Sequence, residues 1–418
     1  MIGFDMHNTA TRHPATAVLR VFLPFAFGYF LSYLFRVVNA VIAPDITADL
    51  GLGPSTLGLL TASYFISFAS SQLPLGILLD RYGPRIIEAG LLIFAAAGAL
   101  IFARAQSLTG LIVGRSLIGF GVSACLMAAF KSYVIWFPRE SLARVNGIQM
   151  ASGALGALAA SSPVEWALGF TDWRGVFTLL ALLCVLASLA VYFLVPQQPS
   201  QTNGTDLATQ VKEIIQILKS REFLRLAPLA ALSQGGYIGI QGLWAGPWLR
   251  DVAGLDRHGA AQILSLAAVA MVFGFIGLGS IAERLARRGI PVRTSAVTGM
   301  GALICIQALI TFNAPLPPAL ILVFFGFFGT SGILSYTALT LAFPSHLSGR
   351  VTTGINLMVF IGAFVLQWAV GVVINLWPQV GPGQYAVEGY RAGFCMVTAL
   401  QCAGLLWYIW KRDTSRNP

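Results

Sequence analysis

Gly76-Ile-Leu-Leu-Asp80-Arg81-Tyr-Gly83-Pro84-Arg85 places a short polar turn between two long apolar runs, Ser55–Leu79 and Ile86–Ala103. Each run is long enough for a membrane-spanning helix, which needs about 20 apolar residues. A carboxylate and a guanidinium group in so tight a turn can pair across it and hold both helices in one orientation. We therefore expect a gating loop here. The alternative is an ordinary cytoplasmic loop that carries the positive charge typical of that side.

The composition is that of a membrane protein. Of the 418 residues, 56% are hydrophobic and 10% are charged, whereas a soluble globular protein carries about 25% charged residues. A soluble core could not hide so much apolar surface, but a bilayer accepts it on the outside. The net charge of +10 is scattered between apolar runs and forms no long basic cluster. It therefore indicates orientation in a membrane, and we expect no binding of nucleic acid.

The chain lacks the side-chain patterns of an enzyme or of a cofactor site. The five cysteines lie within apolar runs, and their spacing fits neither a disulfide framework nor a metal site. The sequence has no phosphate-binding loop of the ATPase type and no Ser, Cys or His constellation for hydrolysis. We expect no enzymatic activity, no cofactor and no metal.

Windows of about 20 apolar residues predict an all-α membrane protein with twelve transmembrane helices. The first six spans are 18–43, 55–79, 86–104, 107–133, 143–168 and 173–195, and the second six are 226–250, 259–282, 293–312, 316–342, 350–376 and 388–410. Between the sets, the segment from Asp206 to Lys219 has apolar residues at helical spacing, which predicts a short amphipathic helix on the membrane surface. The predicted domains are an N-terminal bundle (1–195), a cytoplasmic linker (196–225) and a C-terminal bundle (226–418).

The positive charges predict the orientation. If both termini are cytoplasmic, most of the 26 Lys and Arg residues lie in inner loops, tails and inner helix ends. The outer loops then hold Arg104, Arg174, Arg250, Arg257 and Arg391. This asymmetry follows the positive-inside rule. We expect a monomeric, multi-pass protein of the inner (plasma) membrane, in contact with lipid, with both termini in the cytoplasm.

The polar turn has a faint copy in the second half of the chain. Gly279-Ser-Ile-Ala-Glu283-Arg284 repeats the Gly, acid and Arg spacing of the first copy but has Ala286 where the first has Gly83. The pattern G-x-x-x-D-R-x-G-x-R resembles the signature loop between helices 2 and 3 of the major facilitator superfamily of secondary transporters. That resemblance covers almost the whole chain and implies two pseudo-symmetric six-helix bundles. It also implies a substrate site at the midplane between bundles that rock to expose it alternately.

Arg36 is the first candidate for substrate binding. It lies about 13 Å from the outer surface by helical rise, too deep for its side chain to reach water easily. Such a cation needs a water-filled cavity or an anion. Its helical neighbours include Tyr33 and Asn39, which make a polar stripe suited to a cavity wall. Binding of a substrate anion is the favoured interpretation, and a structural pair with a carboxylate is the alternative.

Arg115 and Glu165 are the candidates for coupling, and Arg115 is also a candidate for substrate binding. Arg115-Ser-Leu-Ile-Gly119 resembles the Arg-x-x-x-Gly motif in helix 4 of the family, where the arginine is tied to coupling and to helix packing. It lies at nearly the depth of Arg36, so two unpaired cations would repel unless an anion or Glu165 offsets them. Glu165 is the one carboxylate that we place within a span, which makes it the candidate for proton coupling. An interfacial acid is the alternative.

The seventh span carries amides and aromatic rings at spacings of three and four residues. Gln234, Tyr237, Gln241 and Trp244 would share one helix face and suit an organic solute, while packing is the alternative. Asn356 in the eleventh span is a further candidate, and inter-helix bonding is its alternative.

These observations predict a secondary transporter that moves a small solute by alternating access with proton symport. The substrate class that they favour is an organic anion. Spans 2 and 8 contain no arginine, unlike the nitrate/nitrite branch of the superfamily, which argues against nitrate. The alternatives are proton-driven efflux of an amphiphilic compound and a non-transporting membrane sensor of the same fold.

Overall fold

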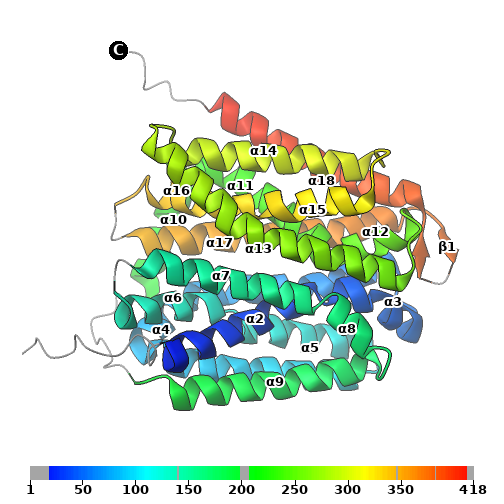
Figure 1. Cartoon of the computed structure of the whole chain (residues 1–418), viewed down its shortest axis with the longest axis horizontal. Coiled ribbons are helices and arrows are strands. Elements are labelled where there is room, and N and C mark those ends of the chain that lie inside the picture. The colour runs from blue at the N-terminus through cyan, green and yellow to red at the C-terminus, as the bar shows by residue number, and fades with distance from the viewer. Residues whose placement is uncertain (1–17, 139–140, 198–206, 345–346, 382, 412–418) are drawn as a thin grey trace, which may run out of the picture.

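The computed structural model describes residues 18–138, 141–197, 207–344, 347–381 and 383–411. Figure 1 shows two groups of long helices that run side by side. The N-terminal lobe consists of η1 (Val18–Phe22), α2 (Leu23–Val37), α3 (Asn39–Leu50), α4 (Pro54–Arg104), α5 (Leu108–Gly121), α6 (Cys125–Trp136), α7 (Leu142–Ala159), α8 (Ser162–Ala167) and α9 (Trp173–Leu194).

The C-terminal lobe follows the linker helix α10 (Leu207–Lys219), which contacts α17. Its helices are α11 (Arg221–Gly239), η3 (Ile240–Trp244), α12 (Ala245–Asp251), α13 (Arg257–Arg287), α14 (Val292–Thr311), α15 (Pro318–Gly329), η4 (Thr330–Gly332), α16 (Ile333–Thr340), α17 (Ser348–Ile374) and α18 (Val387–Trp410). A two-stranded antiparallel hairpin, β1 (Gln379–Gly381) and β2 (Gln384–Tyr385), precedes α18.

The predicted fold class is confirmed. Ten described helical segments are long and apolar enough to cross a membrane. The two other expected spans correspond to α7–α8 and to α11–η3–α12, which are helical over the expected length but interrupted. The hydrophobic exterior is visible in large side chains such as Phe193 and Phe273, which are 71% and 64% exposed. In a bilayer these rings contact lipid.

The polar turn at 80–85 shows why its glycine is needed. The backbone of α4 is helical through both the second and third expected spans except at Gly83, where φ is 80° and ψ is 157°. That conformation is essentially restricted to glycine. The side chain of Asp80 lies outside the described part of the structure, so its pairing stays a prediction. The Arg85 guanidinium carbon lies 4.9 Å from the ring centre of Tyr192 on α9.

The second copy of the turn is held differently. Glu283 pairs with Arg287, one helical turn along α13, at 3.5 Å. Both side chains are largely exposed, and such a surface pair contributes little to stability. The role of Glu283 and Arg284 in gating therefore remains a prediction from the sequence.

Five of the spans are broken near their middle, which the hydropathy pattern does not reveal. The breaks lie at Val38, at 122–124, at 160–161, at the π-helical turn η3 and at the 3-10 turn η4. Interrupted helices inside a membrane are tolerated where the freed backbone groups meet protein or a water-filled cavity. They therefore indicate where a cavity lies.

The two ends of the molecule differ. We call the end with α3, α8, α12 and the β1–β2 hairpin the hairpin face, and the end with α10 and the adjoining ends of α6 and α16 the linker face (Figure 1). At the hairpin face α3 contacts η3 and α12 across the lobes, and α8 contacts α13. The lobes are therefore joined at this end.

Candidate functional site

A cavity of about 420 Å³ lies between the lobes. It is lined by residues of both lobes, from α2, α4, α6, α7, α11, α13, α15, η4, α16 and α17 together with the break at 122–124. The volume falls within the range of about 300–1,000 Å³ typical of small-molecule sites. Its walls mix aromatic and aliphatic side chains with hydroxyls and amides, which is the composition of a site for an organic solute.

Arg36 is the only charged residue among the described residues that line this cavity. It is 6% exposed, and its guanidinium carbon lies 4.4 Å from the ring centre of Tyr33, 5.0 Å from that of Phe360 and 5.7 Å from that of Phe68. Phe360 belongs to the C-terminal lobe, and its ring centre lies 4.2 Å from that of Phe68. Cation–π contacts of this kind contribute roughly 0.5–2 kcal/mol each, but they supply no counter-charge.

A hydrogen-bonded chain beside Arg36 connects the lobes. The Tyr336 hydroxyl donates to Asn356 Oδ1 at 3.0 Å, and Asn356 Nδ2 donates to Gln72 Oε1 of the N-terminal lobe at 2.9 Å. Tyr33, Gln234, Tyr237 and Asn356, all expected at the site, line the cavity. Sequence reasoning missed Phe68 and Phe360, because an aromatic ring within an apolar span carries no signal that distinguishes a cavity wall from a packed core.

Gln241 and Trp244 do not line this cavity, although helical spacing placed them on one face with Gln234. The reason is the π-helical turn η3, which accommodates an extra residue and so rotates the following face by about 100°. Trp244 Nε1 instead donates to the Gln367 carbonyl at 2.9 Å. Gln241 Nε2 contacts Met271 Sδ at 3.3 Å and borders a separate void of about 20 Å³.

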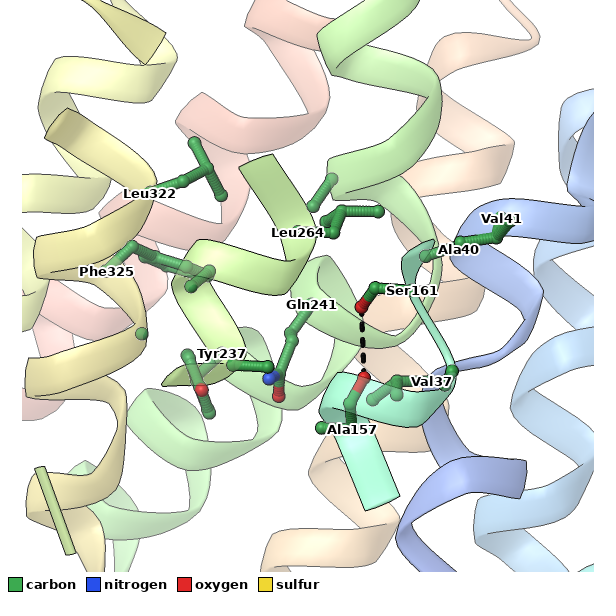
Figure 2. A pocket seen from close by; sticks show the side chains of 15 residues that line it. Val37, Ala40, Val41, Ala157, Ser161, Tyr237, Gln241, Leu264, Leu322 and Phe325 are labelled. Atoms are coloured by element: carbon green, nitrogen blue, oxygen red, sulfur yellow. Dashed lines mark hydrogen bonds between the residues drawn. The ribbon is translucent and has the colours of Figure 1, made fainter. Parts of the chain in front are cut away.

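That small void lies between the lobes on the hairpin-face side of the cavity. Figure 2 shows Tyr237 and Gln241 of the C-terminal lobe facing Ala157 and Ser161 of the N-terminal lobe. Ser161 Oγ donates to the Ala157 carbonyl at 3.0 Å. A volume of this size holds about one water molecule. The void is too small for an organic solute, so the cavity ends here.

Arg115 and Asn39 are both fully buried away from the cavity. The Arg115 guanidinium carbon lies 5.0 Å from the ring centre of Tyr64, and its three nitrogens have no hydrogen-bond partner among the described residues. Asn39 Nδ2 donates to Thr61 Oγ1 at 2.9 Å within the N-terminal lobe. The structure therefore does not bring these two residues to Arg36, and their predicted roles in substrate binding find no geometric support.

The hairpin face is closed by polar contacts between the lobes. Arg257 of α13 donates through both terminal nitrogens to Asp45 of α3, at 3.0 and 2.6 Å. Ser162 of α8 and Ser265 of α13 also meet across the lobes, with their hydroxyl oxygens 2.8 Å apart. These contacts hold the cavity shut toward the hairpin face.

Glu165 belongs to this closure and not to a coupling site beside an arginine. Its carboxylate lies 3.2 Å from Nδ1 of His258 on α13, so it offsets the charge of neither Arg36 nor Arg115 as expected. The prediction that Glu165 is the one carboxylate within a span was also wrong, because Glu88 lies on α4 within the third expected span and is completely buried. The sequence signal for Glu88 was an acid three residues inside an apolar run, which is easily assigned to the preceding loop.

The ion pair at the hairpin face gives a testable prediction. Asp45→Asn should lower the ratio of protein closed at the hairpin face to protein open there by roughly fivefold. A partly exposed ion pair contributes about 1 kcal/mol to the closed arrangement. A cysteine at Ala160, which lines the void, reports this opening by its rate of labelling with an impermeant maleimide applied at the hairpin face. The charge swap Asp45→Arg with Arg257→Asp should restore slow labelling. Fast labelling of the swapped protein would show that the pair does not close this face.

A solute-sized cavity enclosed between two lobes of membrane-spanning helices defines a multi-pass membrane transporter. The family model of the Major Facilitator Superfamily matches residues 25–366. The chain belongs to the Major Facilitator Superfamily, whose members are secondary transporters and not enzymes. The resemblance found in the polar turn is thereby confirmed.

Known relatives and solved structures agree with this assignment. The chain is 24% identical over 365 residues to the probable sulfoacetate transporter of Cupriavidus necator, a match that covers 82% of this chain and 85% of the relative. A nitrate/nitrite transporter of Picosynechococcus sp. is 34% identical over 131 residues, covering 31% and 24% of the two chains. A putative multidrug resistance protein of Yersinia enterocolitica is 25% identical over 227 residues, covering 52% and 48%.

Among solved structures, the fold is similar to that of a bacterial homologue of the human lysosomal transporter Spinster in an inward-facing, unoccupied conformation. The TM-score is 0.73 at 18% identity, and the match covers 96% of this chain and 98% of that one. At this identity the likeness concerns the fold alone.

Proposed function

We propose that this protein carries a small organic anion through the cavity between its lobes. The observation that carries the proposal is that Arg36 is the only charged residue among the described lining residues. A permanent cation in a site without a carboxylate favours an anion, because burial of an unpaired charge is costly. The relative from Cupriavidus necator, named for a sulfonated carboxylate, supports the same class.

The size of the cavity favours an organic anion over nitrate. A volume of about 420 Å³ would leave most of the site empty around a four-atom ion. Tyr29, Tyr33 and Tyr336 line it together with Gln234 and Asn356, and these rings and amides suit a larger solute with polar groups. The absence of arginine from spans 2 and 8 points the same way. Small-molecule sites typically combine such an apolar wall with a few polar groups.

We also propose the direction in which the cavity opens. Asp45, Arg257 and the paired serines join the lobes at the hairpin face, whereas α6 and α16 of the linker face make no extended contact with each other in the described chain. The loop charges support a cytoplasmic position for the linker face, the domain linker and both termini, in a bacterial-type inner membrane. The conformation is then inward-open, and the two predicted bundles rock about the cavity, with proton symport as the coupling.

A binding and flux panel tests the proposed class. Purified protein is challenged in thermal-shift assays with sulfoacetate, glucuronate, nitrate, a neutral hexose and a lipophilic cation. We expect the organic anions to stabilise it, by about 2.7 kcal/mol at 100 times the Kd, and to exchange across proteoliposomes. The relative named as a multidrug protein favours efflux as the second candidate. Binding of the lipophilic cation alone would establish that candidate, and binding of an anion without any exchange would favour a sensor.

A further inference from the structure

Glu88 is a buried acid that forms no ion pair with any residue that the structure describes. It lies in the second half of α4, five residues after Gly83, and its side chain has no exposed surface. Neither carboxyl oxygen makes a hydrogen bond of good distance and angle with any of the described residues. The carboxyl group extends toward α2, where a Cβ added at Gly28 would lie 2.3 Å from Oε1. The absence of a side chain at Gly28 therefore makes room for the acid.

The groups around Glu88 cannot neutralise a negative charge. From α6, the Cys125 thiol lies beside the carboxyl group, and Tyr133 is within electrostatic range. Cys184 of α9 is within electrostatic range of Cys125. Tyr133 already donates its hydroxyl hydrogen to Gln149 of α7 at 2.7 Å. No described salt bridge involves Glu88.

The protonation state follows from these surroundings. An ionised carboxylate at membrane depth, with only the Cys125 thiol as a donor and no paired cation among the described residues, costs several kcal/mol. Glu88 therefore holds its proton in this conformation. A neutral side chain of similar volume could fill the same space if packing were its only role, and ionisable residues inside membranes are typically functional. Loss of the proton requires water or a new hydrogen-bond donor to reach the group.

The break in the fourth span connects this acid to the cavity. Cys125 is the first residue of α6 and follows the non-helical residues 122–124. Val122 and Ser123 of that break line the cavity. The Ser32 hydroxyl donates to the Val122 carbonyl at 3.4 Å, and Ser32 lies one helical turn before Arg36 on α2. The break at 122–124 therefore connects the surroundings of Glu88 with those of Arg36.

We propose that Glu88 is the proton-binding group of the N-terminal lobe and that the break at 122–124 transmits its protonation state to the cavity. The acid O–H bond breaks as the proton passes to water on the linker face, and the carboxylate takes up a proton again after the lobes reorient. Movement of α6 about the break admits the water. This inference rests on the proposed anion transport and names its coupling group.

Glu88→Gln tests the proposal, since glutamine keeps the shape of the acid but cannot titrate. We expect the variant to exchange sulfoacetate at equal pH at close to the rate of the unaltered protein. It should lose the accumulation that a pH gradient drives in the unaltered protein. That accumulation is about tenfold for each pH unit and each proton carried. Glu388→Gln is the matched control, because that acid is exposed in the first turn of α18, and it should accumulate sulfoacetate normally.

Infrared spectroscopy of the purified protein reads the proton site without any substrate. The carboxylic acid C=O band of Glu88 should titrate with pH and disappear in Glu88→Gln. In Glu88→Asp the band should shift, and this variant still tests the proposal if the glutamine variant folds poorly. If the unaltered protein does not exchange sulfoacetate, the proposed class of transported anion is wrong. The infrared titration would still decide whether Glu88 binds the proton. A band that never titrates, or full pH-driven accumulation by Glu88→Gln, would overturn the proposal.

Discussion

Arg36→Gln is expected to abolish high-affinity binding of the organic anion while the protein still folds. Hydrogen bonds to charged groups contribute about 1.5–3 kcal/mol each, so loss of a two-pronged contact raises the Kd by about 100-fold. The apo protein should melt no lower than before, because the substitution removes a buried cation that has aromatic rings but no carboxylate against it. Isothermal titration with sulfoacetate or the best anion of the panel, together with thermal melting, measures both effects.

Two further variants define what the arginine contributes. Arg36→Lys keeps the positive charge but loses the planar fork, and we expect an intermediate loss of about tenfold in affinity. Arg287→Gln removes the same charge from an exposed position on α13 and should leave the Kd unchanged. If Arg36→Gln binds anions as tightly as the unaltered protein, the cation in the cavity has a structural role and the proposed substrate class is wrong.

Gly246→Leu is expected to hold the hairpin face open. Gly246 of α12 packs against the backbone of α3, and an added Cβ would lie 1.8 Å from the Ala40 carbonyl oxygen. A backbone group cannot move aside as the tip of a side chain can, so the closed arrangement excludes the larger residue. When the lobes separate at this face the clash disappears. The labelling rate of a cysteine at Ala160 should therefore rise at least about tenfold, the equivalent of 1.4 kcal/mol.

The control for this experiment is Gly301→Leu. Gly301 is also a glycine within a helix, α14, but nothing lies within 4 Å of an added Cβ there. It should leave the labelling rate unchanged. Gly246→Ala introduces a smaller clash, which gives an intermediate result if leucine prevents folding. Slow labelling of folded Gly246 variants would show that the contact between α3 and α12 persists through the transport cycle.

The transmembrane organisation was predictable because it depends on local properties. Each expected span corresponds to described helix, since twenty apolar residues in a bilayer must satisfy their backbone hydrogen bonds within the segment. The turn at Gly83 was equally accessible, because its positive φ requires glycine. Arg36 could be identified as well, since a permanent charge far from either surface needs water or a counter-charge wherever the helix packs.

What the sequence determined by itself was the membrane class, the spans, the turn at 80–85 and the depth of Arg36, all of which follow from one segment at a time. Only the tertiary structure decided which of two equally deep arginines reaches the cavity and how far the η3 turn rotates the seventh span. It also decided that Glu88 enters the lobe interior while Glu165 joins the hairpin face. These outcomes depend on which helix faces meet across the lobes, and contacts between residues hundreds of positions apart leave no periodic trace in the chain.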